Sequence, residues 1–186
     1  TNWARASGGA VTAVVKTDGT LWTWGYNGLG GLGQGNTISR SSPVQVGALT
    51  NWSSTSGKSY GCQAIKTDGT LWAWGQNGYG QLGLNNTSTV YSPVQVGALT
   101  TWSSVAAGDA SILAIKTDGT LWIWGNGSVQ NIGGIIAGAT TNTSSPVQVG
   151  TDTTWSTICA TEQRVFALKT DGTIWAWGCN SGSFQL

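Results

Sequence analysis

The sequence has 186 residues, enough for about one domain, and contains 29 Gly and 12 Trp but no His or Met. Charged residues make up 8% of the chain and the formal net charge is +1, which argues against electrostatic capture of nucleic acid or of an anionic membrane. Apolar runs stay below about 18 residues, so we expect no membrane insertion. The sequence opens without a visible signal peptide or an initiator Met, and we expect a processed form or a fragment.

Three cysteines are present, Cys62, Cys159 and Cys179, and none belongs to a Cys-x-x-Cys pair. Because the chain has no His, this spacing argues against a structural zinc site. The odd count leaves at least one thiol free. A Cys159–Cys179 disulfide is one alternative, since both residues fall near strand ends of one repeat, but thiols without a role are the favoured interpretation. The redox compartment stays undecided.

A repeat divides the sequence into four units. The pentapeptide KTDGT begins at Lys16, Lys66, Lys116 and Lys169, in steps of 50, 50 and 53 residues. An aromatic run follows each copy (LWTWG, LWAWG, LWIWG and IWAWG), and a further tryptophan precedes each copy by 13 or 14 residues. These positions account for all 12 tryptophans. We therefore predict one domain over 1–186, with units at 3–51, 52–101, 102–154 and 155–186.

The third unit shows the predicted elements in chain order. The runs 102–107 (WSSVAA) and 111–116 (SILAIK) are short and rich in β-forming residues. An Asp-Gly pair follows and predicts a hairpin with a type I′ turn, from which 120–124 (TLWIW) returns. After a glycine-rich loop, 144–148 (SPVQV) is a fourth strand with its proline near the start. Four short strands per unit, without helical periodicity, predict an all-β fold made of β-propeller blades.

The repeated side chains have structural roles in this interpretation. Each Trp ring buries roughly 150–250 Å², so we expect the tryptophans to pack between blades rather than to stack on a ligand. The aspartates of the KTDGT copies are expected in turns, where Asp is favoured, rather than in a ring of carboxylates. These aspartates are Asp18, Asp68, Asp118 and Asp171.

Two glycine-rich loops, 28–33 (GLGGLG) and 78–83 (GYGQLG), match the Gly-x-Gly-x-x-Gly pattern of dinucleotide-binding loops. Such a loop needs a strand before it and a helix after it, and no helix is predicted here. The third unit also loses the pattern while keeping its surroundings. We interpret these glycines as positive-φ positions in the loop that leaves each tryptophan strand, and we predict no cofactor.

The unit Trp52–Gly97 carries the pattern most fully, with AIKTDGTLWAWGQNGYGQLG followed by SPVQV. This pattern resembles the repeat of the regulator of chromosome condensation family, and the resemblance covers essentially the whole chain in about 3.7 copies. It implies a β-propeller, usually of seven blades. The best-known member is a guanine nucleotide exchange factor that acts on chromatin, whereas many others are binding or scaffold modules.

Several features depart from this family pattern. A histidine that is common after the first strand of a unit is replaced by Val11, Gly61, Ser111 and Arg164. The loops of the third and fourth units are irregular, and the chain has no basic tail for DNA. These departures count against exchange-factor activity. The uniform repeats look more like a bacterial or phage version of the family.

The strand count leaves the ring incomplete. About 15 strands are predicted, which make three complete blades and three strands of a fourth. A half-ring exposes two apolar blade faces, which soluble monomers avoid. The chain is therefore part of a longer polypeptide, pairs with a second copy or closes as a four-bladed ring, and we favour the first two.

Catalytic groups are scarce in the sequence. There is no His, Glu162 is the only glutamate, and no nucleophile elbow, zinc-protease motif or P-loop lysine occurs. We predict a non-enzymatic binding or structural module without catalytic residues, metal or cofactor, whose loops present a surface to a protein, through self-association or an assembly partner. The candidate partner-binding loop residues are Tyr26, Asn27, Gln76, Asn77, Tyr79, Asn126, Gln130 and Asn180.

Two other functions stay open. One is exchange or regulation of a small GTPase, implied by the resemblance. The other is a lectin, because amides and aromatic rings in these loops suit the hydroxyls and faces of a glycan. The low charge and the abundance of Ser, Thr, Asn and Gly favour an extracellular or virion surface over other locations, without fixing one.

Overall fold

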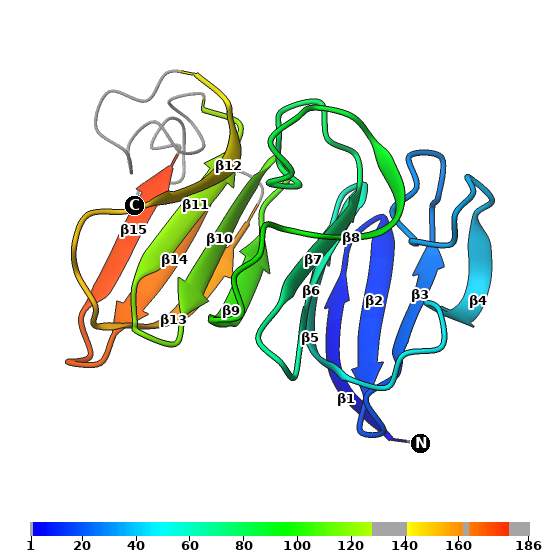
Figure 1. Cartoon of the computed structure of the whole chain (residues 1–186), viewed down its shortest axis with the longest axis horizontal. Coiled ribbons are helices and arrows are strands. Elements are labelled where there is room, and N and C mark those ends of the chain that lie inside the picture. The colour runs from blue at the N-terminus through cyan, green and yellow to red at the C-terminus, as the bar shows by residue number, and fades with distance from the viewer. Residues whose placement is uncertain (1, 128–140, 162–163, 179–186) are drawn as a thin grey trace, which may run out of the picture.

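The computed structural model of the chain describes residues 2–127, 141–161 and 164–178. Within these ranges the chain forms 15 β-strands and no helix, arranged in four antiparallel sheets (Figure 1). The first three sheets have four strands each and the fourth has three. Strand order within each sheet follows the chain, so each sheet is a meander. The predicted all-β propeller fold and the predicted strand count are confirmed.

We call the four sheets blades 1 to 4. Their strands are β1 (Trp3–Gly8), β2 (Val11–Lys16), β3 (Leu21–Gly25) and β4 (Arg40–Gln45) in blade 1; β5 (Trp52–Lys58), β6 (Gly61–Lys66), β7 (Leu71–Gly75) and β8 (Val90–Gln95) in blade 2; β9 (Trp102–Ala107), β10 (Ser111–Lys116), β11 (Leu121–Gly125) and β12 (Thr143–Gln148) in blade 3; and β13 (Trp155–Ala160), β14 (Arg164–Lys169) and β15 (Ile174–Gly178) in blade 4.

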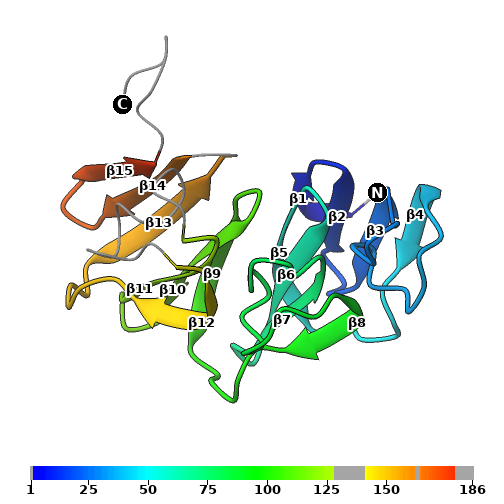
Figure 2. The ribbon, with the colours of Figure 1, turned by 90° about the horizontal axis from the view of Figure 1, so that it is seen from above.

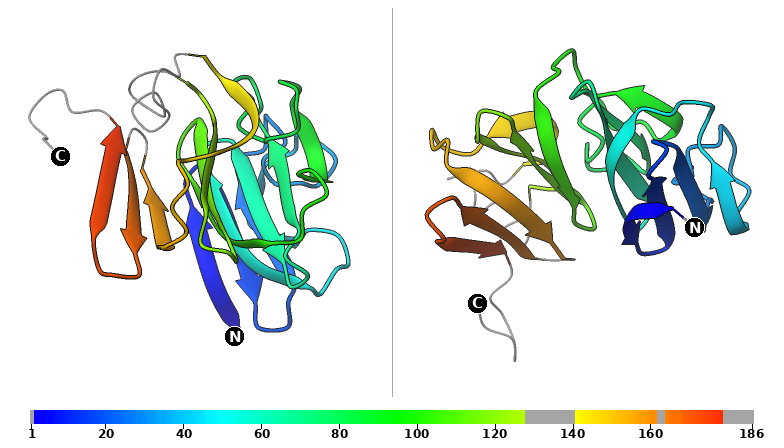
Figure 3. Two further views of the ribbon diagram at one scale, coloured as in Figure 1. Left: turned by 60° about the vertical axis from the view of Figure 1, so that its left-hand side comes forward. Right: turned by 90° about the horizontal axis from the view of Figure 1, so that it is seen from below.

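The blades follow one another around an arc, which is clearest from above (Figure 2). The first strands β1, β5, β9 and β13 are neighbours from blade to blade and lie on the concave side. The last strands β4, β8 and β12 lie on the convex side, as the views in Figure 3 also show. Blades 1 and 4 form the two ends of the arc, so the four blades do not close into a ring.

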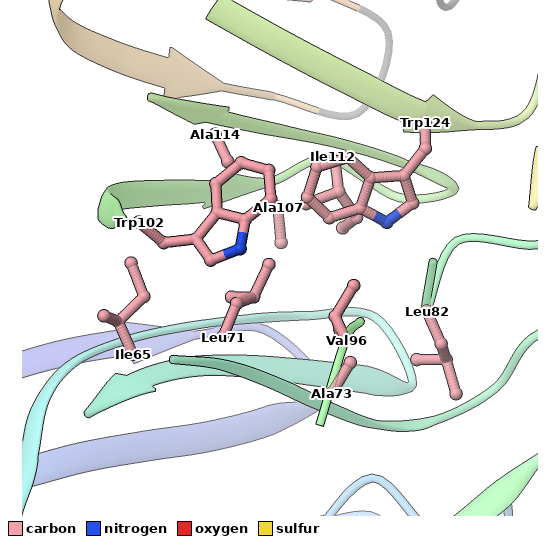
Figure 4. Packing of buried hydrophobic residues seen from close by; sticks show 10 residues of the cluster. All are labelled: Ile65, Leu71, Ala73, Leu82, Val96, Trp102, Ala107, Ile112, Ala114 and Trp124. Atoms are coloured by element: carbon pink, nitrogen blue, oxygen red, sulfur yellow. The ribbon is translucent and has the colours of Figure 1, made fainter. Parts of the chain in front are cut away.

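Adjacent blades pack face to face through the same kind of contact each time. We call the face of a blade that meets the next blade along the chain its leading face, and the opposite one its trailing face. Figure 4 shows the middle interface, where Ile65, Leu71 and Val96 on the leading face of blade 2 meet Trp102 and Trp124 on the trailing face of blade 3. Side chains alternate along a strand, so each strand supplies both faces.

The same pairing of aliphatic and tryptophan side chains recurs at the other two interfaces. Leu21 and Val46 of blade 1 pack against Trp52 and Trp74 of blade 2. Leu121 and its neighbours in blade 3 pack against the first tryptophan of blade 4 in the same way. The prediction that tryptophans pack between blades is therefore confirmed at the three internal interfaces.

Hydrogen bonds join the blades as well. Serines on the concave strands accept from the next blade, where Gly57 N lies 2.7 Å from Ser7 Oγ and Ala107 N lies 2.9 Å from Ser56 Oγ. These bonds cross between first strands that are about 50 residues apart in sequence, so they fix the lateral position of neighbouring blades.

The KTDGT turn differs from the prediction. Gly19 N donates to Lys16 O at 3.0 Å and Lys16 N donates to Thr20 O at 2.9 Å, so the loop has three residues. Gly19 has a φ of 78°, whereas Asp18 is outside the left-handed region. The predicted type I′ turn needs two positive φ values and is wrong; the pattern fits a type I turn followed by a left-handed glycine.

The Asp, Thr and Trp of this motif form one hydrogen-bonded chain. Asp18 Oδ1 accepts from Thr20 N at 2.9 Å and from Thr20 Oγ1 at 2.6 Å, and Thr20 Oγ1 accepts from Trp22 Nε1 at 2.8 Å. The same three bonds occur in blades 2 and 3, and the Asp–Thr bonds recur in blade 4. The aspartates are therefore turn residues, as predicted.

The lysine of each motif lies over tryptophan rings. Lys66 Nζ is 3.6 Å from the ring centroid of Trp72 and 5.0 Å from that of Trp52. Such cation–π contacts stabilise a cation at an aromatic face. Partial burial lowers the pKa of Lys66 and of its counterpart Lys116, because a charged ammonium loses hydration there.

Candidate functional site

The described candidate residues lie at one end of the blades, which we call the loop end. It is the upper end in Figure 1 and carries the loops 26–39 and 76–89, together with the turns that join the first two strands of blades 1 to 3. The KTDGT turns lie at the opposite end. The repeat therefore separates a uniform turn end from a variable loop end.

Asn27 and Asn77 support these loops from inside. Asn27 Oδ1 accepts from Leu32 N at 2.9 Å, and its Nδ2 donates to Asn36 O at 2.9 Å. Asn77 is also fully buried and makes the equivalent bonds to Leu82 N and Asn86 O, both at 2.9 Å. The expectation that these two amides face a partner is therefore wrong, because both are buried inside the loops.

The glycines of the two loops permit a close approach to the next blade. Gly30, Gly33, Gly80 and Gly83 have φ between 68° and 77°, as the sequence interpretation expected, whereas the first glycine of each pattern does not. A Cβ on Gly33 would lie 2.8 Å from Trp74 Nε1, and one on Gly83 would lie 2.9 Å from Trp124 Nε1. These glycines thus serve packing between blades.

The same two indoles fasten each loop to the following blade. Trp74 Nε1 donates to Gly31 O at 2.9 Å, and Trp124 Nε1 donates to Gln81 O at 3.0 Å. A backbone hydrogen bond adds to this attachment, because Gly35 N donates to Tyr91 O in β8 of the next blade at 2.8 Å. The loops 26–39 and 76–89 are therefore fixed both by a buried asparagine within each loop and by the indole of the following blade.

All four tyrosines of the chain lie at the loop end, and each is between 40% and 48% exposed. Tyr26 follows β3, Tyr60 lies in the turn between β5 and β6, Tyr79 lies in the second loop, and Tyr91 is the second residue of β8. The ring centroids of Tyr26 and Tyr60 are 5.3 Å apart in an edge-on arrangement. Tyr26 and Tyr79 were predicted as surface residues, and both are exposed.

Tyr60 and Tyr91 were not identified from the sequence. Their places in the repeat are taken elsewhere by small residues, such as Ala10 and Ala110 for Tyr60, and Ser144 for Tyr91. Comparison of the repeat copies could have identified both positions, because each has a large aromatic residue where other copies have small ones. Aromatic side chains that replace small residues at loop tips are typical of binding surfaces.

The remaining candidate residues contribute less to this surface. Gln76 is half-buried beside Tyr60, whose carbonyl accepts from Gln76 N at 3.0 Å. Asn126 is half-buried and hydrogen-bonded. Gln130 and Asn180 lie outside the described residues.

Two equivalent grooves lie between the outer strands of neighbouring blades, with volumes of about 640 and 470 Å³. The larger contains Trp102, Trp122 and Pro146, and the smaller contains Trp52, Trp72 and Pro93 in the same arrangement. The described side chains that line them include no titratable group. The tryptophan and proline side chains in these grooves can receive apolar groups.

The described cysteines are free thiols. Cys62 is buried near Thr55, and burial raises the pKa of its thiol to about 12. Cys159 is exposed, and its proposed partner Cys179 lies outside the described residues. In the part of the chain that the structure describes, His, Cys, Asp and Glu form no group suited to a metal, and no helix is long and apolar enough to cross a membrane.

Comparisons with known proteins identify the repeat. Two family models of the regulator of chromosome condensation (RCC1) repeat match the sequence, one over residues 18–57 and 68–115 and the other over residues 102–130. The matched ranges cover more than half of the chain. No curated protein matches the sequence.

Solved structures share the fold. Human WBSCR16 has a TM-score of 0.83 and 18% identity over 96% of this chain and 47% of its own. Prp20p of Saccharomyces cerevisiae has a TM-score of 0.82 and 20% identity over 96% of this chain and 46% of its own. Yeast Prp20 is also described bound to Kap60, and its binding to Gsp1p and histones is described as well. The chain spans a little under half the length of these proteins, and the likeness shows the fold.

Proposed function

Because the chain belongs to the regulator of chromosome condensation (RCC1) repeat family, we propose that it is a non-enzymatic binding module whose loop end receives a protein partner. The observation that carries this proposal is the position of the tyrosines. All four are at the loop end and between 40% and 48% exposed, whereas the tryptophans buried at the internal interfaces are 6% exposed or less. Tyrosine supplies a large contact area at a low cost in conformational entropy.

The way in which the loops are held supports the same proposal. Buried asparagines and indole hydrogen bonds hold the loops in place, so the tyrosines of loops 26–39 and 76–89 require little ordering when a partner binds. The Tyr26–Tyr60 pair also joins blades 1 and 2 across their upper edge. A surface that spans two blades suits a macromolecule better than a small ligand.

The near-neutral charge of the chain favours a protein over nucleic acid. Protein binding is also what is described for the yeast relative. An extracellular or virion surface location belongs to this proposal and rests on composition. Regulation of a small GTPase is the second candidate, and the observation in its favour is membership of this repeat family. A lectin remains the third, supported by Gln76 beside the Tyr26–Tyr60 pair.

The test compares partner capture by three forms of the chain. Proteins from a lysate of the source organism are captured on the unmodified chain, on Tyr26→Ala/Tyr60→Ala, and on Leu49→Ala as a control that removes an equally exposed side chain away from the loop end. We expect the double variant to weaken capture of a specific protein at least about tenfold, because aromatic anchors dominate interfaces. Equal capture by all three forms would overturn the proposal.

Two parallel measurements separate the alternatives. Accelerated nucleotide release from a member of a GTPase panel would favour the regulator. Binding to a glycan array that is lost in Tyr79→Ala would favour the lectin.

A further inference from the structure

One buried polar side chain interrupts the apolar interface between blades 2 and 3. Gln63 is 1% exposed, and its side-chain oxygen Oε1 is buried without a hydrogen-bond partner among the described residues. The register gives the same position to Ala13, Leu113 and Phe166 in the other blades. Because a buried acceptor without a partner destabilises a fold, packing does not explain an amide at this position.

Gln63 lines a small cavity between the two blades at the loop end, with a volume of about 10 Å³. The other polar residues of its lining are Gln81, Gln76, Lys58 and Asp109. Gln63 and Gln81 are buried, Gln76 and Lys58 are half-buried, and Asp109 is exposed. The polar lining therefore runs from the interior of the interface to the surface of the loop end.

The equivalent place between blades 1 and 2 lacks these polar groups. Ala13 and Gly31 stand there for the two buried glutamines, and Ser59 stands for the aspartate. The hydroxyl of Ser59 itself donates to Asp109 Oδ1 across the interface. Among the residues described, neither Asp109 nor Lys58 takes part in an ion pair. The polar cavity is thus a feature of one interface and not of the repeat.

We propose that this cavity receives the ammonium group of a lysine side chain of the partner protein. An ammonium group has three donors and no acceptor, which suits the unpaired oxygen of Gln63, and its charge suits the carboxylate of Asp109. A volume of about 10 Å³ holds roughly one water-sized group, so the compact ammonium fits better than the planar guanidinium of arginine. The inference rests on the proposed function, because it names what the partner presents to the loop end.

The surroundings of the cavity suit the rest of a lysine side chain. Ala107 and Ile112 of blade 3, both labelled in Figure 4, are apolar parts of the lining. Two exposed tyrosines adjoin the cavity, since Tyr60 lies between lining residues in the β5–β6 turn and Tyr79 N donates to Gln81 Oε1 at 2.9 Å. Aromatic rings near a cation attract its charge and cover its methylene groups.

Lys58 opposes the binding of a cation, because it belongs to the lining and carries the same charge as the proposed occupant. Replacing Lys58 by a neutral residue should therefore strengthen the binding of a lysine side chain. If the cavity instead received a carboxylate, the same replacement would weaken binding and Asp109→Asn would strengthen it. The two substitutions together identify the sign of the charge that the cavity binds.

The first experiment uses a short peptide with blocked ends, whose only charged residue is a central lysine, as the probe. Nuclear magnetic resonance follows the side-chain amide of Gln63 and the backbone amide of Gly61 during titration. Matched peptides carry norleucine, Nε-acetyl-lysine or arginine in place of the lysine. We expect a saturable shift of both signals with the lysine peptide, and little shift with the other three.

Variants of the chain locate the binding site, with affinities measured from the signal of the Gly61 backbone amide. Gln63→Leu introduces the residue of the equivalent position in blade 3 and should weaken binding of the lysine peptide at least about tenfold. Asp109→Asn should weaken it about threefold, because this carboxylate is exposed, and Lys58→Gln should strengthen it. Gln45→Leu is the matched control, because Gln45 is half-buried in blade 1, away from the cavity.

The stability of the unbound chain separates a binding role of Gln63 from a structural one. Gln63→Leu removes a buried acceptor without a partner, so it should raise the midpoint of unfolding in urea. Circular dichroism checks that each variant is folded. A lower midpoint for Gln63→Leu would show that the amide supports the fold and would overturn the proposal.

Partner capture separates this inference from the function on which it rests. We expect Gln63→Leu to weaken capture of the partner and Gln45→Leu to leave it unchanged. Weaker capture by Tyr26→Ala/Tyr60→Ala with unchanged capture by Gln63→Leu would overturn the lysine site and support the proposed function. Peptide binding that depends on Gln63, without capture of any protein, would support the site and overturn the function. Equal shifts with the norleucine or arginine peptide, or equal binding by all variants, would overturn the site.

Discussion

The internal interfaces and the two end faces use the same repeat positions in different surroundings. Leu71 is fully buried at an internal interface, whereas Ile174 at the same position in blade 4 is largely exposed. The outer faces of blades 1 and 4 carry the residue types that are buried at the internal interfaces, as Trp3 and Ile174 show. The repeat sets which residue occupies a position, but the neighbouring blade determines how much that residue contributes to the stability of the fold.

The largest expected effect comes from removing a tryptophan at an internal interface. Trp124 is fully buried between blades 2 and 3 and donates to Gln81 O, so Trp124→Ala loses both packing and a hydrogen bond. We expect a loss of about 3–5 kcal/mol in the free energy of unfolding. Urea denaturation followed by circular dichroism measures it.

Trp24→Ala is the matched control at an end face. Trp24 occupies the same position in blade 1 but is half-buried, and its ring centroid lies 6.2 Å from that of Trp3 in the same blade. We expect a smaller loss of about 1–2 kcal/mol, because less packing is removed. Equal losses for the two variants would show that burial by the next blade is not what stabilises these residues.

An effect smaller than that of Trp124→Ala is expected inside the loops. Asn77→Ala removes the acceptor of Leu82 N and leaves a buried donor unpaired. We expect a loss of about 2–3 kcal/mol in the free energy of unfolding. Tyr79→Ala, two residues away at the exposed tip, should change stability by less than about 0.5 kcal/mol. If both substitutions were equally mild, the loop would not depend on its buried amide.

The repeat made most of the fold predictable from sequence. Four copies of KTDGT, each followed by a tryptophan strand, give the strands, their order and the incomplete fourth blade, because period-2 alternation and turn residues are local signals. The turn type was wrong because Asp-Gly fits both two-residue and three-residue loops. The number of residues between the paired Lys16 and Thr20 decides between them, and pairing register is not a local property.

The candidate surface was predictable only in part. Asn27 and Asn77 looked like solvated amides, since the sequence does not show that the loop folds back over them. Tyr60 and Tyr91 come from a turn and an outer strand rather than from the tryptophan loops, and they join the surface only when neighbouring blades are placed side by side. Contacts between blades depend on geometry beyond one repeat unit.

The smallest expected effect concerns the turn end, where blades should behave alike. Hydrogen bonds from the Thr120 hydroxyl and backbone lower the pKa of Asp118 below its ordinary value of 3.8. The pKa of Asp118 is lower in the folded state than in the unfolded state, so the ionised carboxylate stabilises the fold above about pH 4. This contribution is lost as the pH falls through the folded-state pKa. Asp118→Asn should therefore be less stable than the unmodified chain near neutral pH.

The difference between the two proteins should shrink as the pH falls below about 4, and unfolding by urea at a series of pH values measures it. Asp18 has the same partners in blade 1, and its pKa is lowered by the same bonds from Thr20. Asp18→Asn should thus match Asp118→Asn, although blade 1 is at an end of the arc and blade 3 is internal. A difference that persists in strong acid would contradict the carboxylate's role. A larger effect in blade 3 than in blade 1 would mean that even this turn depends on the neighbouring blade.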